Sequence, residues 1–219
     1  MSDMFALEGP RFGPAAGGKP QSLVLLLHGL GADGNDLISL APYWTRLLPN
    51  TAFVSPHAPF PCDMAPYGRQ WFSLQDRSQT MILAGVKAAA PILDAFIDAE
   101  LKKHGLTEDR LALVGFSQGT MMSLYVAPRR PRAVAAVVGY SGALVGADTL
   151  PVEAKSKPPI LLVHGEMDDI VPFQAMAAAA AGLRAVGLQV ETVARPGLPH
   201  SIDDVGLTRG GTFLAEHLR

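Results

Sequence analysis

The residues with the clearest chemical potential form the pentapeptide Gly115-Phe116-Ser117-Gln118-Gly119. It follows an apolar run, Leu111–Val114, and precedes a helix-compatible segment, residues 120–127. This order predicts a buried strand, a tight turn with serine at its apex, and then a helix. The glycines let strand and helix pass close together, and the helix N-terminus surrounds the hydroxyl with a positive field. The serine has the setting of a nucleophile, although such a string also occurs in ordinary turns.

Short apolar runs alternate with longer helical patterns on both sides of this turn, and these elements must position any site. The predicted strands are Ser22–Leu27, Thr51–Val54, Leu111–Phe116, Ala133–Tyr140, Ile160–Val163 and Gln189–Ala194. The predicted helices are Ser78–His104 with a kink or break at Pro91, a helix from Pro172 through Ala181, and Ile202–His217. The alternation predicts one α/β domain over residues 1–219, with a mostly parallel sheet, helices on both faces and no large cap. Residues 1–20 are expected to be an N-terminal extension or edge segment.

Composition narrows the classes of protein to consider. Hydrophobic residues make up 48% and charged residues 17% of the 219 residues, which is typical of a globular domain. A net charge of −2 without a basic cluster argues against a nucleic-acid partner. The single cysteine, Cys62, excludes an internal disulfide, and the start of the sequence lacks a signal-peptide pattern. No run approaches ~18 apolar residues, so we expect no transmembrane segment and a cytoplasmic location. The oligomeric state is left open, a homodimer included.

Polar residues with catalytic potential follow several of the predicted strands. Ser117 ends one strand, Asp168 and Asp169 follow a later one, and His200 follows the last. Ligands of such sheets bind beyond the carboxyl ends of the strands, so these side chains are expected to meet there. The chain order serine, acid, histidine is the one expected of α/β-hydrolases.

Other residues of the sequence are also candidates for the histidine and the acid. His217 also follows the acids, but it belongs to the last turn of a helix, where a cation complements the helix dipole. Spacing alone does not choose between Asp168 and Asp169. The pair Asp203-Asp204 fits the solvated first turn of the last helix.

The loop after the first strand allows two readings. Gly29-Leu30-Gly31-Ala32-Asp33-Gly34 is a literal GxGxxG, the fingerprint of dinucleotide binding. That reading also needs an acidic residue about 20 positions on, where the chain has Val54-Ser55-Pro56-His57 instead. The alternative is an oxyanion hole made by the backbone N–H groups of Leu30 and Gln118. His28 and His164 are expected to be structural, and no metal site is predicted.

The motif segments together resemble a known family. They are residues 27–31, Arg69-Gln70-Trp71-Phe72, Gly115–Gly119, His164–Asp168 with Val171-Pro172, and His200-Ser201-Ile202. In this order they are similar to the carboxylesterase and acyl-protein thioesterase family, small α/β-hydrolases also described as phospholipase/carboxylesterases. The resemblance implies that Asp168 is the acid of a triad with Ser117 and His200. It further implies a serine esterase or thioesterase that works through an acyl-enzyme and needs no metal or organic cofactor.

The sequence indicates the reaction more closely than it indicates the substrate or the class of enzyme. Five apolar residues are candidates for lining an acyl site: Leu30, Met64, Trp71, Phe72 and Leu144. Without a cap we expect an open site that favours small to medium acyl chains. The alternatives are an acyl-protein or acyl-CoA thioesterase or lysophospholipase, a hydrolase of amides or lactones on the same triad, and a non-catalytic binding protein on the same fold.

Overall fold

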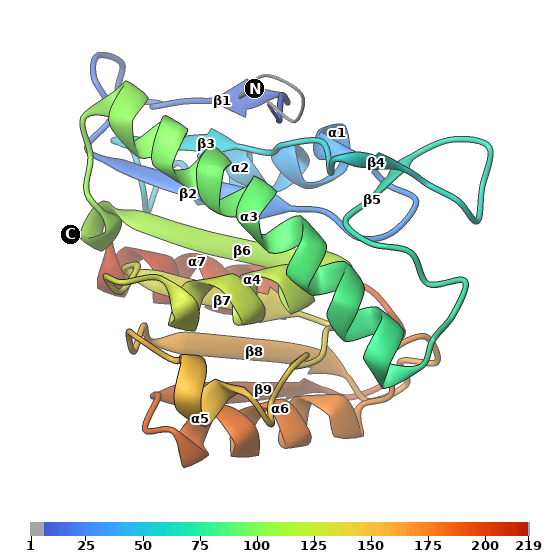
Figure 1. Ribbon diagram of the computed structural model, residues 1–219. Coiled ribbons are helices and arrows are strands. Elements are labelled where there is room, and N and C mark those ends of the chain that lie inside the picture. Colours follow the sequence, from blue (N-terminus) through green and yellow to red (C-terminus); the bar gives the residue numbers. More distant parts are fainter. Residues whose placement is uncertain (1–6, 219) are drawn as a thin grey trace.

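The computed structural model describes residues 7–218, and within them a seven-stranded sheet forms the centre of the molecule (Figure 1). The spatial order of its strands is β1-β3-β2-β6-β7-β8-β9. Their bounds are β1 Arg11–Phe12, β2 Ser22–Leu27, β3 Thr51–Val54, β6 Leu111–Phe116, β7 Ala136–Tyr140, β8 Ile160–Gly165 and β9 Val190–Arg195. Neighbouring strands are parallel except for the β1–β3 pair, so the carboxyl ends of β2, β6, β7, β8 and β9 share one edge.

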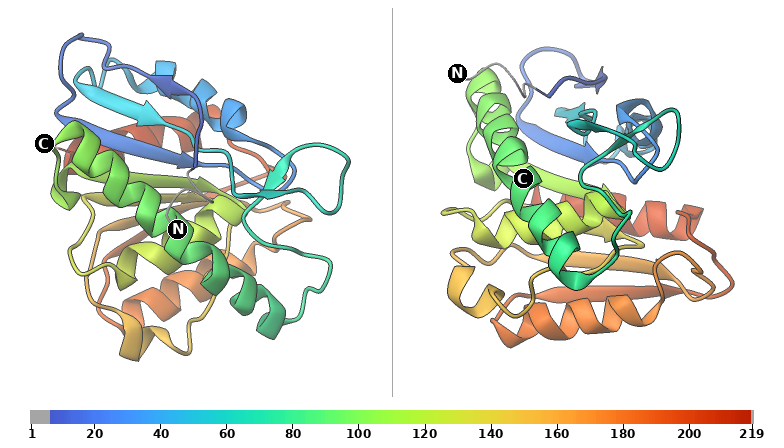
Figure 2. Two further views of the ribbon diagram at one scale, coloured as in Figure 1. Left: turned by 45° about the horizontal axis from the view of Figure 1, so that its top comes forward. Right: turned by 45° about the vertical axis from the view of Figure 1, so that its right-hand side comes forward.

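Helices cover both faces of this sheet. One face packs against α3 (Gln79–His104), α4 (Gln118–Arg129), α5 (Leu150–Glu153) and α6 (Gln174–Ala185). The other packs against α1 (Gly34–Leu37), α2 (Ala41–Trp44) and α7 (Asp204–His217). The right-hand view of Figure 2 shows α3 and α7 on opposite sides of the strands. This is the single-domain α/β architecture that the sequence predicts, and no large cap is present within residues 7–218.

The side chains of β2 show why this segment forms a central strand. Leu23, Leu25 and Leu27 enter the core on the α3–α4 face. Val24 and Leu26 enter the core on the α7 face. Successive residues of a strand point to opposite faces, so a continuous apolar run satisfies two cores at once.

The long helix α3 begins and ends as the sequence predicts. The Ser78 hydroxyl caps its first turn by accepting from the N–H of Met81, and Gly105 ends it at φ +66°. The expected break at Pro91 is absent, because the helix runs through this residue. Pro91 lies on the exposed side, where water can solvate the carbonyl that loses its partner.

Other differences concern the ends of elements and very short strands. The strand expected from Ala133 begins at Ala136, and the helix expected from Pro172 begins at Gln174. A hairpin of β4 (Phe60–Pro61) and β5 (Arg69–Gln70) was not predicted, and its loop projects at the right of Figure 1. Of the expected N-terminal segment, residues 7–20 are described, and they contain the antiparallel edge strand β1. Residues 1–6 lie outside the described part.

Within the described residues, α3 is the one helix whose length and composition are sufficient to cross a membrane. Its buried residues, among them Val86, Leu93 and Ile97, belong to the core on the sheet. Core helices meet the same criteria, so the result is weak evidence for a membrane span.

Candidate active site

Ser117 stands at the turn between β6 and α4 in a conformation that few residues other than glycine adopt. Its φ is +54°, and one further non-glycine residue of the described chain, Ser141, has a positive φ. The N–H of Ser117 donates to the Tyr140 carbonyl at 3.0 Å, and its carbonyl accepts from the N–H of Met121 at 3.1 Å. The strained backbone is therefore held by β7 on one side and by the first turn of α4 on the other.

The two glycines of the pentapeptide are required by close packing. A Cβ at Gly119 would lie 1.7 Å from the Leu27 carbonyl oxygen, and one at Gly115 would lie 2.3 Å from the backbone of Gly119. Such approaches exclude any side chain. The strand–turn–helix geometry thus explains both glycines and raises the serine above the sheet edge.

Asp168 and His200 meet across the ends of β8 and β9. Asp168 Oδ2 accepts from His200 Nδ1 at 2.7 Å, and Asp168 Oδ1 accepts from the N–H groups of Ile170 at 3.0 Å and Val171 at 2.8 Å. Burial acts to raise the pKa of the Asp168 carboxyl, but these hydrogen bonds outweigh it and hold the pKa below its ordinary value. Because Nδ1 carries the proton, Nε2 of His200 is free to accept one.

A second histidine contacts the same carboxylate. Nε2 of the buried His164 lies 3.2 Å from Asp168 Oδ2 and 2.9 Å from the carbonyl oxygen of Val171. Both neighbours are acceptors, so Nε2 of His164 carries the proton. The sequence assigned His164 a structural role, and the structure specifies it: this ring fixes the orientation of the carboxylate that contacts His200.

The loop that carries His200 is closed by an ion pair. Arg195, the last residue of β9, donates from Nε to Asp203 Oδ2 at 2.9 Å. Asp203 also caps α7 by accepting from the N–H of Gly206 at 2.8 Å. His200 therefore lies in a short loop that is attached to the sheet at one end and to a helix at the other.

Ser117 and His200 line one cavity of about 360 Å³. The ring of Phe116 packs on the His200 ring with centroids 4.7 Å apart. The whole lining is Gly29, Leu30, Leu74, Arg77, Ile82, Phe116, Ser117, Met121, Ile170, Val171, Pro172 and His200. We call this the catalytic cavity; apart from three polar side chains, its wall is apolar.

The glycine-rich loop after β2 lies beside Ser117. A Cβ at Gly29 would lie 3.4 Å from the Ser117 Cβ, and Leu30 lines the catalytic cavity. Gly31, at φ +78°, donates to the carbonyl of Arg69 at 2.9 Å. The loop is thus placed close enough to Ser117 for a backbone N–H to face a reacting carbonyl.

Gln118 uses its side chain to attach another loop to this region. Its Oε1 accepts from the Trp71 N–H at 3.1 Å, and its Nε2 donates to the Phe72 carbonyl at 2.8 Å. Its own backbone N–H belongs to the first turn of α4, where no preceding carbonyl of the helix is available. That N–H therefore has no acceptor within the helix.

Trp71 is fully buried and does not line the catalytic cavity, in contrast to the expected acyl-binding role. Its indole N–H donates to the His28 carbonyl at 3.0 Å. Phe72, the other half of the aromatic pair, is 2% exposed and also lies outside the cavity wall. Both rings belong to the core beneath the loop.

His28 is buried and neutral. Its Nε2 accepts from the N–H of Ala58 at 3.0 Å, so Nδ1 carries the proton and contacts the Gly29 carbonyl at 2.7 Å. Burial is the main cause that lowers the pKa of His28 to about 4. The predicted structural role of this histidine agrees with these contacts.

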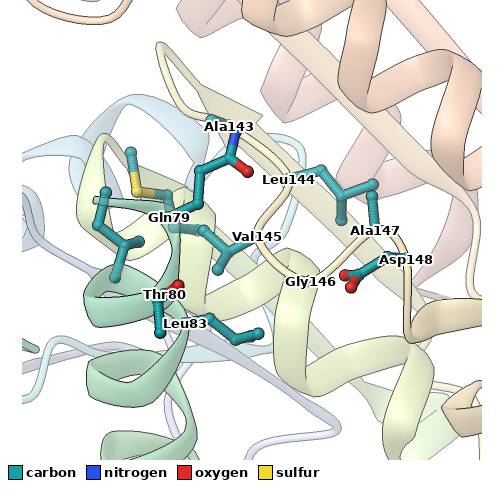
Figure 3. A pocket seen from close by; sticks show the side chains of 11 residues that line it. Gln79, Thr80, Leu83, Ala143, Leu144, Val145, Gly146, Ala147 and Asp148 are labelled. Atoms are coloured by element: carbon teal, nitrogen blue, oxygen red, sulfur yellow. The ribbon is translucent and has the colours of Figure 1, made fainter. Parts of the chain in front are cut away.

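Two further residues expected at the substrate site lie elsewhere. Met64 is 49% exposed in the β4–β5 loop and lines none of the cavities described here. Leu144 lines a second cavity of about 560 Å³ between α3 and the loop after β7 (Figure 3). This second cavity shares Ile82 and Met121 with the catalytic cavity, so these two side chains separate the two spaces.

The sequence reasoning missed Ile82, Met121 and Arg77 as wall residues. Met121 had a usable signal, because it lies four residues after Ser117 and therefore on the same helix face. Ile82 and Arg77 come from the start of α3 and the turn before it, which reach the site by tertiary packing. Among the described residues, no group of three or more His, Cys, Asp or Glu side chains is arranged to hold a metal ion.

The comparison with protein families decides the class. A family model described as Phospholipase/Carboxylesterase matches residues 14–218. The chain belongs to the phospholipase/carboxylesterase family. The resemblance predicted from its motif segments is therefore confirmed, and so is the α/β-hydrolase fold.

Relatives of this family member carry enzyme names. It is 30% identical over 199 residues to esterase YpfH of Escherichia coli, covering 91% of this chain and 82% of that protein. It is 28% identical over 212 residues to acyl-protein thioesterase 1 of Gibberella zeae, covering 89% and 90%. The crystal structure of esterase PE8 matches with a TM-score of 0.92 and 41% identity over 97% of this chain and 99% of that one. This member of the phospholipase/carboxylesterase family is a carboxylic ester hydrolase.

Proposed function

We propose that the protein is a serine carboxylesterase that cleaves esters of small to medium acyl chains through an acyl-enzyme on Ser117. The observation that carries this proposal is the Asp168–His200 hydrogen bond of 2.7 Å at the wall of the cavity that Ser117 also lines. The paired imidazole is oriented by a buried carboxylate, which is how a serine hydroxyl is activated.

The proposed first half-reaction forms the acyl-enzyme. Ser117 Oγ attacks the carbonyl carbon of the ester while Nε2 of His200 takes the hydroxyl proton, which gives a tetrahedral oxyanion. The oxyanion collapses, the bond to the leaving group breaks, and His200 returns the proton to the departing alcohol or thiol. Asp168 stays ionised and stabilises the imidazolium.

The second half-reaction repeats these steps with water. His200 removes a proton from water, the resulting hydroxide attacks the acyl carbonyl, and Ser117 leaves with the proton from His200. In both halves the backbone N–H groups of Leu30 and Gln118 are proposed to hold the oxyanion. Each such donor contributes about 10²–10³-fold in rate.

The shape of the catalytic cavity supports the substrate class. A volume of about 360 Å³ with Leu30, Ile82 and Met121 on its wall suits an apolar acyl group of modest length. Leu144, a predicted substrate contact that lines the second cavity, would contact only a chain that extends past Ile82 and Met121.

Thioesters form a second candidate substrate class. The observation in its favour is the similarity to acyl-protein thioesterase 1 of Gibberella zeae. A thiol leaving group uses the same steps, because His200 delivers the proton to sulfur instead of oxygen. Parallel assays with acyl esters and acyl thioesters of the same chain length measure the preference directly.

A fluorophosphonate probe tests the nucleophile, with Ser117→Ala as the matched control. We expect covalent labelling of the wild type and none of the variant. Absence of labelling in the wild type would remove the serine-hydrolase proposal, and equal labelling of the variant would remove Ser117. Rates on 4-nitrophenyl esters from acetate to palmitate then test the chain-length proposal, which a maximum at palmitate would contradict.

We keep the cytoplasm as the proposed compartment. The support is the lone and unpaired Cys62, because disulfides are rare in the reducing cytoplasm. Fractionation of cells that express the full chain tests this location.

A further inference from the structure

Arg77 is the charged side chain on the wall of the catalytic cavity. The lining residues include no aspartate or glutamate, and beside Ser117 and His200 the remaining side chains are apolar. A cation on an otherwise apolar wall adds an electrostatic element that the reaction at Ser117 does not use.

Arg77 lies in the turn before α3, and its charge has no partner there. The carboxylate of its neighbour Asp76 accepts from the N–H of Ser78 at 2.8 Å, and Ser78 Oγ accepts from the N–H of Met81. Both polar neighbours are therefore engaged with the backbone. In residues 7–218, Arg77 itself has no ion pair or hydrogen bond.

This condition is unusual among the arginines of the described chain. Apart from Arg46 and Arg77, each contacts a carboxylate or a backbone carbonyl: Arg11, Arg69, Arg110, Arg129, Arg130, Arg132, Arg184, Arg195 and Arg209. Arg46 is exposed beyond α2 and lines none of the cavities described here. Arg77 is exposed as well, but it lines the catalytic cavity, so an unpaired arginine borders the substrate space.

We propose that Arg77 is a specificity-determining residue that favours esters carrying an anionic group, a carboxylate or a phosphate. The planar guanidinium can bind either group through two parallel N–H···O hydrogen bonds, while the apolar wall holds the carbon chain between anion and ester. The inference rests on the proposed function, because it assigns a substrate class to the same site.

Matched pairs of esters that differ by one charge test this selectivity. Monomethyl adipate and methyl hexanoate place the carboxylate or its neutral equivalent on the acyl side, and methanol release is measured. The acetate ester of 4-hydroxybutanoate and butyl acetate do the same on the alcohol side, and acetate release is measured. The observable is the ratio of kcat/KM for the anionic ester to that for its neutral partner.

We expect the ratio to exceed one for the wild type on one of the two sides. Arg77→Gln should lower that ratio about fivefold or more, because a charge-assisted bidentate contact is lost. Arg77→Lys should retain a large part of it, and added salt should reduce it by screening. Arg46→Gln removes the other unpaired arginine and should leave the ratio at the wild-type value.

Failure of the inference and failure of the proposed function give different results. If the wild type hydrolyses neutral esters and Arg77→Gln has the wild-type charge ratio on both sides, the inference is wrong and the proposed function stands. An equal fall of the ratio in Arg46→Gln would also overturn it, since that arginine is remote from the cavity. If the wild type hydrolyses no ester faster than Ser117→Ala, the proposed function fails and the inference fails with it.

Discussion

At the end of β8, polar side chains bond to one another as well as to the backbone, whereas at the end of β2 they bond to backbone atoms. Asp168 contacts His200 and His164 through one carboxylate oxygen. Beside β2, Trp71 and Gln118 reach the carbonyl oxygens of His28 and Phe72. The first arrangement contains a charge at the point where protons would move, and the second contains only neutral groups in the core.

Because of this difference, substitutions at the β8 end should affect catalysis, whereas substitutions at the β2 end should affect stability. Replacing a carboxylate at the β8 end changes the protonation of the base while most of the fold is retained. Removing a donor at the β2 end leaves a buried carbonyl without a partner, which is mainly a cost in folding free energy. Single substitutions at the two strand ends test this division.

The substitution Asp168→Asn should lower kcat by about 10⁴-fold, because the amide no longer holds His200 in the tautomer that accepts a proton from serine. The free energy of unfolding should change far less than the rate. Steady-state kinetics on a chromogenic ester and urea denaturation measure the two quantities. Asp169→Asn is the control, and a greater loss in that variant would move the acid to Asp169.

Neutral His28 should make the β2 end sensitive to acid. Its folded pKa of about 4 lies below the ordinary 6.5, so the unfolded chain binds an additional proton as the pH falls through this interval. Its contribution of about 3 kcal/mol to the free energy of unfolding is present above pH 6.5 and is lost towards pH 4.

The control for this acid sensitivity is His28→Gln, whose side-chain oxygen can still accept from the Ala58 N–H. We expect a shallower dependence of unfolding free energy on pH in the variant, measured by urea denaturation from pH 7 to pH 4. Equal slopes in both proteins would show that another group is responsible. Half-buried His104, whose pKa is also lowered by desolvation, is common to both and cancels in the difference.

Trp71→Phe should destabilise the fold by about 1–3 kcal/mol, because the His28 carbonyl loses its buried donor. Its effect on acyl-chain preference should be absent, since Trp71 does not line the catalytic cavity. Denaturation and the nitrophenyl ester series measure these outcomes. A shifted chain-length optimum with unchanged stability would restore the substrate-binding role expected from the sequence.

Met64→Ala should produce the smallest effect. The side chain is half exposed in the β4–β5 loop and away from the catalytic cavity, so the free energy of unfolding should change by less than about 0.5 kcal/mol. The value of kcat/KM for a short-chain ester should stay at that of the wild type. A several-fold change in KM would indicate that this loop contacts substrate.

Features at the ends of parallel strands were the ones that the sequence predicted well. Central strands such as Ser22–Leu27 and Thr51–Val54 were predicted with their observed ends, because runs buried on both faces stand out in composition. The meeting of an acid with His200 followed from their positions after parallel strands, and the family resemblance selected Asp168, the residue that contacts His200. Strand ends that share one edge make such predictions possible.

The features that the sequence did not predict depend on contacts that leave no periodic pattern in the sequence. The two-residue strand β1 and the β4–β5 hairpin are too short to carry a pattern. Trp71 was expected at the substrate site because of the family resemblance. In the sequence, an aromatic residue near a site looks the same whether it faces the cavity or the core. The contact between His164 and Asp168 depends on side-chain directions that spacing alone does not determine.

The ion pair between Arg195 and Asp203 has a consequence for the timing of catalysis. By joining the two ends of the loop around His200, it shortens the segment that is free to fluctuate and thereby reduces the conformations the imidazole can sample. If His200 is the base, as proposed, the entropy of arranging it is then largely spent during folding and not at each turnover. With its loop closed in this way, the His200 imidazole has nearly the same orientation each time a substrate binds.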